Sequence, residues 1–592
     1  MTHVPRSTRK IPWASALLCL SLAAGCASLR PPQERPAGGD PAALTVVAEI
    51  ALERGDCKAA AESYARAAAV GAAPLARRAS EVALACEHLP AAWQSVSRWR
   101  SLAPGDGQAD ALYAAVALKL YRLADARAAI ADFWRVQARE QAKPSEPEQT
   151  PEPGKAREPR KLREVGKAGR PAANLTELTA LLLEQSDAPA VLAAMSGAFE
   201  LASVSPEVLS LLGELALDGY DAQRAQRYAQ LALERNPSDF AAKRVLARSY
   251  VVRGDPAKAI ATATEARRDD AVRGAFELAE ILTALDRVED AHQELEHLRT
   301  TDASPAEIDR RLALLAFHAG DMKEAQQRFA ELAARGEAND AALLYLADIA
   351  ARDGDTDAAL AGYRRLADSS VALPARSRAA SLLLARSNRT EALTLLDDYA
   401  AEHPESEFEL TLAKARLLAD HGEAETGLAL LSSALERHPQ HPSIQYDRAV
   451  ILEQAGHVHE SAEVLDQLLV ERPEDPVLLN ALGYTLADHG LQLSRAESLI
   501  RRALVTMPDN PAALDSLGWV RFRQGDTKGA IAVLERAYTL GRDAEIAGHW
   551  GEALWMSGQH QQARKVWAAA LAREPDSAAL KATLARFLPD AK

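Results

Sequence analysis

The chain has 592 residues, of which 48% are hydrophobic and only 5% aromatic, and its formal net charge is −14 at pH 7. This length exceeds what one compact core needs, so we expect several structural units. The negative charge argues against nucleic acid or an anionic membrane surface as a general partner. Alanine, the best helix former, is abundant, and almost no segment alternates with the two-residue period of a strand. We therefore predict an all-α fold.

Residues 1–25 have the pattern of a secretory signal peptide. A basic start precedes an apolar stretch over residues 11–24, which is too short to span a bilayer. The stretch ends in Leu-Ala-Ala-Gly-Cys at residues 22–26, which resembles the lipobox of bacterial lipoproteins. The resemblance implies cleavage before Cys26 and several acyl chains on this cysteine, enough for a stable anchor. The alternative is an ordinary signal peptide in which Cys26 is incidental.

The residue after Cys26 is alanine and not aspartate. By resemblance to the sorting of enterobacterial lipoproteins, this favours the outer membrane over retention in the inner membrane. We expect a protein that faces the periplasm, with residues 26–40 as a lipidated tether, and surface orientation is the alternative. Removal of residues 1–25 takes away three positive charges (Arg6, Arg9 and Lys10) and no negative ones, so the net charge changes from −14 to −17. We expect membrane contact through the lipid alone.

Residues 41–138 are predicted to form three loosely matching helix pairs, at 41–72, 73–106 and 107–138. Cys57 lies near the start of the second helix of the first pair, and Cys86 lies near the end of the following helix. These antiparallel helices connect near residue 72, midway between the cysteines, so the thiols should lie side by side. In an oxidising compartment we expect a disulfide, which closes a loop of about 30 residues and contributes roughly 3–4 kcal/mol. Two buried free cysteines are the alternative.

Residues 139–173 break this pattern. They are rich in Pro, Glu, Lys and Arg and hold almost no apolar residues, so they cannot bury enough surface to order themselves. We predict a disordered linker. It is interpreted either as a solvated loop or as a segment that folds on a partner.

Residues 174–577 are predicted to form the main array of helix pairs, followed by a capping helix and tail over residues 578–592. A recurring Gly-Asp or Gly-Glu turn sets a period of about 34 residues. With its glycine at position 15, the units start at 206, 240, 272, 306, 340, 373, 408, 442, 476, 511 and 544.

Two positions that were not used to set this frame hold small residues throughout. Position 8 is Ala or Gly from Gly213 to Gly551, and position 20 is Ala, Gly or Ser from Ala225 to Ala563. Two helices approach closely only where their crossing point lacks bulk. This is the tetratricopeptide pattern, and it predicts a TPR-type α-solenoid, a right-handed superhelix of antiparallel helix pairs.

The first helix of each pair lines the concave face of such a superhelix through positions 2, 5, 9, 12 and 13. In the last four units these positions hold many aromatic residues for so aromatic-poor a chain. The candidate protein-binding groove consists of Tyr446, Asn480, Tyr484, Asp515, Trp519, Phe522, Arg523, Glu552, Trp555 and Met556. Exposed aromatics beside Arg and Asn are typical of protein-binding surfaces. The alternative is that these side chains pack between neighbouring first helices or beneath the capping helix.

Motifs for catalysis are missing from the sequence. It holds no Walker loop, Gly-x-Ser-x-Gly elbow, His-Glu-x-x-His pair or Cys-x-x-Cys motif. His457, His459 and Glu460 look like a metal-ligand cluster, but they fall in a repeat turn and are interpreted as solvated. We therefore expect a binding protein and not an enzyme, without catalytic residues, metal or cofactor.

Three segments carry the closest resemblance to a known group of proteins. Residues 480–488 read Asn-Ala-Leu-Gly-Tyr-Thr-Leu-Ala-Asp, residues 514–520 read Leu-Asp-Ser-Leu-Gly-Trp-Val, and residues 545–555 read Glu-Ile-Ala-Gly-His-Trp-Gly-Glu-Ala-Leu-Trp. With the lipobox and the overall size, they resemble the LbcA-like tetratricopeptide lipoproteins of proteobacterial outer membranes, of which the smaller NlpI is a functional analogue.

This resemblance implies an adaptor that brings a periplasmic carboxyl-terminal processing protease to substrates such as peptidoglycan hydrolases. A second hypothesis is an assembly scaffold for envelope machinery, such as polysaccharide export, pili or outer-membrane protein insertion. A cell-wall enzyme would need a catalytic domain, for which the repeats leave no room.

Overall fold

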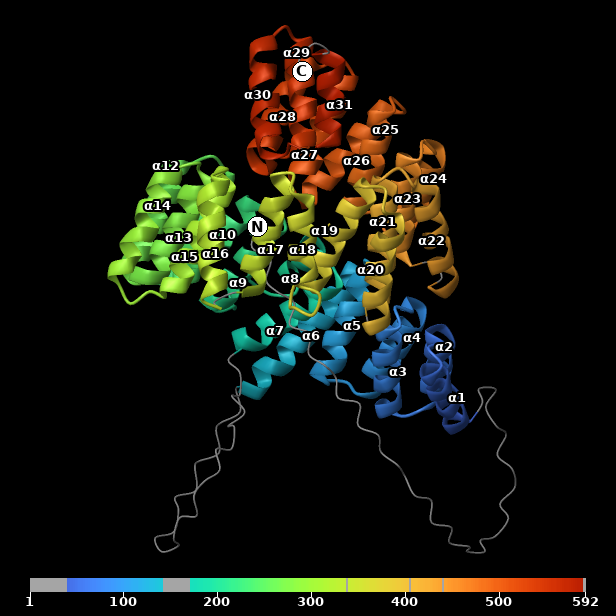
Figure 1. The fold of residues 1–592 in the computed structure, drawn as a ribbon. Coiled ribbons are helices and arrows are strands. Elements are labelled where there is room, and N and C mark those ends of the chain that lie inside the picture. Colours follow the sequence, from blue (N-terminus) through green and yellow to red (C-terminus); the bar gives the residue numbers. More distant parts are fainter. Residues whose placement is uncertain are drawn as a thin grey trace, which may run out of the picture.

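The computed structural model describes residues 40–141, 171–336, 339–403, 406–438, 441–575 and 577–588. All regular elements in these ranges are helices, which follow one another as antiparallel pairs in a superhelix (Figure 1). The predicted TPR-type solenoid is therefore confirmed. The lipidation candidate Cys26 and the signal peptide lie outside the described residues. None of the helices within them combines the length and the apolar character needed to cross a membrane.

The N-terminal helices are α1 (Pro41–Glu53), α2 (Cys57–Val70), α3 (Ala73–Ala85), α4 (Leu89–Leu102), α5 (Gly107–Lys119), α6 (Leu123–Gln141), α7 (Pro171–Gln185) and α8 (Ala188–Ser196). The stretch between α6 and α7, most of the predicted linker, lies outside the described residues. One continuous core nevertheless runs from Ala48 to Val245. The helices on either side of this stretch therefore share one core, and the first pairs pack together with the main array.

The middle of the array consists of α9 (Pro206–Asp218), α10 (Ala222–Arg235), α11 (Phe240–Val252), α12 (Pro256–Asp269), α13 (Ala271–Ala284), α14 (Val288–His297), α15 (Pro305–Ala319), α16 (Met322–Ala334), α17 (Asn339–Arg352), α18 (Thr356–Arg364), α19 (Ala372–Ala385) and α20 (Arg389–Glu402). A short 3-10 turn, Leu298–Thr300, follows α14.

The last part consists of α21 (Glu407–Asp420), α22 (Ala424–Arg437), α23 (Pro442–Gln454), α24 (Val458–Glu471), α25 (Pro476–Asp488), α26 (Leu493–Thr506), α27 (Pro511–Arg523), α28 (Thr527–Gly541), α29 (Ala544–Met556), α30 (His560–Arg573) and α31 (Ala578–Phe587). Helix α31 packs on α29 as the predicted cap.

The Gly-Asp turn explains how one helix of a pair ends and the next begins. Gly254 has a φ of +74°, a left-handed conformation that glycine adopts without steric cost. The side chain of the following residue, Asp255, accepts a hydrogen bond from the backbone N–H of Lys258 at 3.1 Å and so caps α12. The same cap recurs at Asp321 and Asp526.

Small residues at positions 8 and 20 allow the two helices of a pair to touch. A Cβ built on Gly483 would lie 2.5 Å from Ile500, and one built on Gly427 would lie 2.6 Å from the backbone oxygen of Ala415. Larger residues cannot occupy these crossing points without moving the helices apart.

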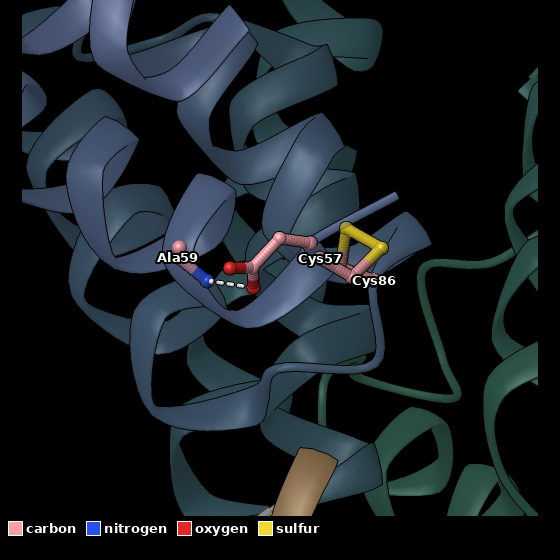
Figure 2. Close-up of a disulfide and its surroundings, with 4 residues drawn as sticks. Cys57, Ala59 and Cys86 are labelled. Carbon is pink, nitrogen blue, oxygen red and sulfur yellow. Dashed lines mark hydrogen bonds between the residues drawn. A yellow bond between two sulfur atoms is a disulfide. The ribbon is translucent and has the colours of Figure 1, made fainter. Parts of the chain in front are cut away.

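Cys57 at the start of α2 and Cys86 at the end of α3 form a disulfide, with a Cα–Cα distance of 5.3 Å (Figure 2). The bond closes 29 residues of chain. It connects two adjacent tips of the superhelix, because each cysteine lies beside a turn between the helices of a pair. Figure 2 also shows the cap of α2, in which the N–H of Ala59 donates to the Asp56 carboxylate.

We predict opposite effects for two alanine substitutions in α29. Gly551→Ala would place its Cβ 2.0 Å from Nε1 of the buried Trp567 and should lower the free energy of unfolding by about 1–3 kcal/mol. Gly548→Ala meets only Thr583 at 3.5 Å and should raise stability by up to about 1 kcal/mol through helix propensity. Chemical denaturation measures both. Equal effects would contradict the proposed close approach.

Candidate protein-binding groove

Four first helices, α23, α25, α27 and α29, carry the candidate groove. Three of them begin with proline, whose fixed φ suits the first helical position and whose missing N–H costs nothing there. The side chains of Asp475, Asn510 and Asp543 cap α25, α27 and α29. Because the four helices have the same length and the same kind of start, side chains one repeat apart face one another.

Trp519 lies at the centre of the groove residues but is only 5% exposed. Its indole Nε1 donates a hydrogen bond to Asp488 Oδ1 of α25 at 2.9 Å. Its ring stacks on His549 of α29, with 4.1 Å between the ring centroids. Trp519 therefore connects three successive first helices.

Asp515 and His549 form a buried ion pair beneath this tryptophan. His549 Nδ1 lies 2.9 Å from Asp515 Oδ2. Burial alone would lower the pKa of His549, but the Asp515 carboxylate outweighs burial, so this pKa lies above its usual value of 6.5. The imidazolium is thus stabilised at neutral pH and helps to hold α27 and α29 together.

Two further polar bonds cross between helices. The carboxylate of Glu552 accepts a hydrogen bond at 2.7 Å from the guanidinium of Arg586, which belongs to the capping helix α31. Tyr484 Oη donates to Glu545 Oε1 of α29 at 2.8 Å. Both bonds fix side chains that the sequence places in the groove.

Asp515, Trp519 and Glu552 therefore do not form an open binding surface. All three are buried, and their polar atoms are satisfied by neighbours on adjacent helices. These three side chains instead pack between neighbouring first helices or beneath the capping helix, which is the alternative to an open groove.

The other predicted groove residues remain at least partly accessible. Tyr446, Asn480, Tyr484, Phe522 and Trp555 are half-buried, whereas Arg523 and Met556 are exposed. The exposed fraction of Met556 is 63%. Trp555 leans against Trp567 and Phe587, with ring centroids 5.7 and 6.1 Å away. These seven accessible residues, from Tyr446 on α23 to Met556 at the end of α29, are called the accessible strip.

Sequence reasoning missed four residues that organise this region: Asp488, Glu545, His549 and Arg586. Three of them bond to a predicted residue 31 or 34 positions away, close to one repeat length. A search for complementary polar residues at this spacing would have found these three, but not Glu545, which lies 61 positions from its partner Tyr484. Such a search would also have indicated that some of the predicted groove residues bond to neighbouring helices.

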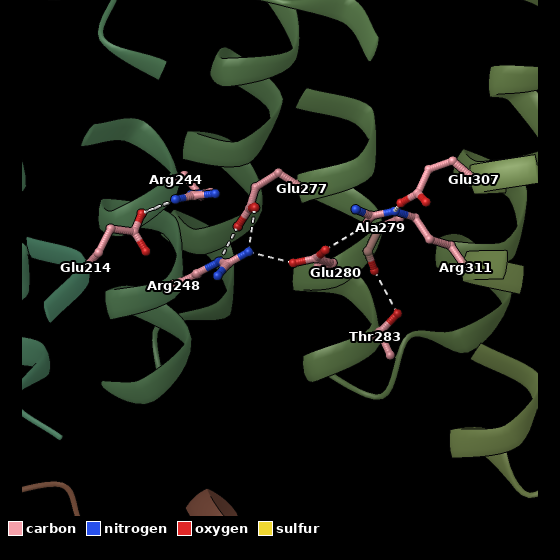
Figure 3. Close-up of polar contacts among 9 residues, drawn as sticks. All are labelled: Glu214, Arg244, Arg248, Glu277, Ala279, Glu280, Thr283, Glu307 and Arg311. Atoms are coloured by element: carbon pink, nitrogen blue, oxygen red, sulfur yellow. Dashed lines mark hydrogen bonds and ion pairs between the residues drawn. The ribbon is translucent and has the colours of Figure 1, made fainter. Parts of the chain in front are cut away.

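Upstream, α9, α11, α13 and α15 carry the same kind of network built from charges. Figure 3 shows arginines that each face carboxylates about one repeat away; the pairs are Arg244–Glu214, Arg248–Glu277, Arg248–Glu280 and Arg311–Glu280. Opposite charges neutralise one another along this face. The arginines of this network are therefore already paired with carboxylates of neighbouring first helices.

Within the described part of the chain, no group of three or more His, Cys, Asp or Glu side chains is placed to hold a metal ion. His457, in the turn singled out from the sequence, pairs with Glu425, with 3.2 Å between Nε2 and Oε1. This turn thus has a polar contact between adjacent repeats.

Comparison with known proteins agrees with this architecture. The tetratricopeptide repeat family model matches residues 210–272, 245–308, 310–372, 412–476 and 480–545. The TPR repeat-containing protein PA4667 of Pseudomonas aeruginosa is 31% identical over 213 residues. The match spans 36% of this chain and 36% of that relative, so the chain covers about a third of the relative's length.

Solved structures of repeat proteins are also similar. A thermophilic TPR protein of Thermus thermophilus, TTC0263, has 23% identity and a TM-score of 0.29, covering 31% of this chain and 98% of its own. A tetratricopeptide repeat protein of Parabacteroides merdae has 19% identity and a TM-score of 0.31, covering 42% and 98%.

The buried ion pair generates a prediction about pH. Because the folded-state pKa of His549 is raised, its contribution to stability is complete below pH 6.5 and is lost as the pH rises through the raised pKa. We expect the His549→Gln variant to be less stable than the parent at pH 6, with the difference shrinking at alkaline pH. Thermal melts between pH 5.5 and 9.5 measure this. His459→Gln, at an exposed turn, is the control and should shift melting equally little at each pH.

Proposed function

We propose that this chain, a tetratricopeptide-repeat protein with homology to a TPR repeat-containing protein, is a non-catalytic scaffold that binds other proteins. The observation that carries the proposal is the solenoid itself, a continuous stack of helix pairs whose first-helix faces are presented side by side. Such stacks offer a long surface to partner chains.

We further propose that the scaffold is lipid-anchored at Cys26, faces the periplasm and brings a carboxyl-terminal processing protease to substrates such as peptidoglycan hydrolases. The lipobox-like ending of residues 22–26 and the three matching segments between residues 480 and 555 support this proposal. Three residues of the accessible strip, Asn480, Tyr484 and Trp555, lie in these segments, and the whole strip from Tyr446 to Met556 is the proposed contact surface. An assembly scaffold for envelope machinery is the second candidate, because the repeat pattern and the anchor suit it equally.

The anchor is tested by replacing Cys26 with serine. We expect the parent protein to incorporate an alkyne-labelled fatty acid and to sediment with outer membranes, because acylation requires the thiol. Cys26→Ser should lose the label. Cys19→Ser, within the predicted signal peptide, is the matched control and should keep it. Labelling of Cys26→Ser at the parent level would refute the anchor.

The contact strip is tested with Arg523→Ala combined with Met556→Asp, two exposed residues of α27 and α29. We expect at least about tenfold less of the protease and hydrolases to co-purify, because a charge replaces an exposed apolar side chain of the strip. Quantitative mass spectrometry of the purified complexes measures this.

The control is Val505→Asp, a residue of α26 that is 76% exposed and outside the strip. It should retain binding, and all variants should keep the parent's helical content. Recovery of envelope-assembly proteins in place of a protease would favour the second candidate. Unchanged recovery with the double variant would remove the strip as the contact surface.

A further inference from the structure

Every helix pair except α7–α8 turns at a tip that contains a residue with a positive φ, and the type of this residue differs between pairs. Most tips hold glycine, which reaches the left-handed region without steric cost. Five tips carry a side chain instead, with φ between 50° and 61°: Glu87, Tyr121, Tyr220, Asp286 and Ser387. Large side chains are strained in this region, so they call for a compensating interaction.

The glycine tips lack such an interaction. A Cβ built at eight of them would meet no heavy atom within 4 Å: Gly55, Gly254, Gly320, Gly354, Gly422, Gly456, Gly525 and Gly558. These tips face open space. Four of the five side-chain tips, all but Ser387, contact a distant part of the chain.

The Glu87 tip touches a part of the chain 354 residues further on. The Glu87 carboxylate lies 3.1 Å from Nε2 of His441, at the start of α23, and 2.6 Å from Nζ of Lys119. His441 is 2% exposed. Its Nδ1 accepts a hydrogen bond from the N–H of Ser443, so the neutral ring carries its proton on Nε2 and donates it to Glu87. A strained tip thus ends in a buried polar contact.

Two tyrosine tips make the next contacts. Tyr121 Oη donates to the backbone oxygen of Glu474 at 3.1 Å. The Tyr220 ring packs against the core formed by residues 449–520, and its backbone oxygen accepts from the N–H of Asp509 at 2.9 Å. Asp509 in turn accepts from the N–H of Ala222 at 2.9 Å. The first superhelical turn therefore reaches into the core of the second.

The contacts continue along the same edge. Asp286 pairs with Arg542 at 2.5 Å, and Arg352, two residues before the Gly354 tip, donates to the backbone oxygen of Arg573 at 3.3 Å. The sequence separation falls from 287 residues at Ala222 to 221 at Arg352. A superhelical turn thus contains fewer residues toward the C-terminus, so the superhelix becomes narrower in this direction.

We infer that the first turn of the superhelix is fastened to the second along an interturn seam, formed by the tips Glu87, Tyr121, Tyr220 and Asp286 and the opposing residues His441, Glu474, Asp509 and Arg542. Figure 1 shows the two turns meeting, with α21–α24 above α1–α4. A cavity of about 170 Å³ between them is lined from both sides, by the disulfide and by Phe408 and His438. The first and second turns of the superhelix are therefore in direct contact along the seam.

His441 makes one contact of the seam sensitive to pH. Burial lowers the pKa of His441 below 6.5, although Glu87 offsets part of this effect. The charged and titratable groups that face it are Glu87, Lys119, Arg472 and His438. Because the closed seam disfavours protonation, this contact is complete above pH 6.5 and weakens as the pH falls through the lowered pKa. The neighbouring Asp187 and Asp475 have raised pKa values through burial and act in the opposite direction.

The test replaces the four tips by glycine in the full chain: Glu87→Gly, Tyr121→Gly, Tyr220→Gly and Asp286→Gly. If local strain were the only effect, these changes would stabilise the protein. The seam predicts the opposite, a larger radius of gyration by small-angle X-ray scattering. It also predicts about tenfold or faster hydrogen exchange at the amides of Ala222 and Asp509, whose acceptors are unchanged. Ser387→Gly, at a side-chain tip outside the seam, is the matched control and should leave both quantities unchanged.

A charge exchange keeps the inference testable if the fourfold variant loses helical content. Asp286→Arg alone should expand the molecule, and Asp286→Arg with Arg542→Asp should restore its dimensions. For the pH contact, exchange at Ala222 and Asp509, corrected for intrinsic rates, should accelerate from pH 7.5 to 5.5 in the parent and less in His441→Gln. Parent-like compactness and protection of both the fourfold variant and Asp286→Arg would overturn the seam.

Discussion

The close approach of the two helices in each pair is the constraint on which the rest of the structure depends. Only Ala, Gly and Ser occupy the crossing points, and at Gly518 even one Cβ would lie 2.5 Å from Leu534. Because the axes are this close, each pair is a rigid unit with a fixed offset to the next. The fixed offset places a given position of one unit beside the same region of its neighbours. The networks of the groove and the contacts between superhelical turns both follow from this regular placement.

Polar residues one repeat apart use this regularity. The bonds from Trp519 to Asp488, from His549 to Asp515 and from Arg248 to Glu277 all connect adjacent first helices. These bonds pair polar groups of the groove with one another, which costs less than leaving buried donors and acceptors unpaired. Its binding capacity consequently lies in the few side chains that remain accessible.

The fold was predictable because it depends on local periodicity. The spacing of the turn glycines and the small residues gave the helix pairs, and the antiparallel connection near residue 72 placed Cys57 beside Cys86. The accessibility of the groove was not predictable in the same way. Burial of Trp519 depends on His549, and burial of Glu552 depends on Arg586 of the capping helix, so each needs a partner from another unit. The contacts between superhelical turns could not be predicted from the sequence, because a 34-residue period does not define how many units complete a superhelical turn.

The interturn contacts also bear on how such a chain can evolve. An open solenoid tolerates the gain or loss of a repeat, since each unit touches only its neighbours. Here Glu87 must meet His441 and Tyr220 must meet Asp509, across intervals that contain a set number of units. One repeat added within such an interval would move every later tip past its counterpart. Duplication and deletion of units are therefore constrained inside these intervals.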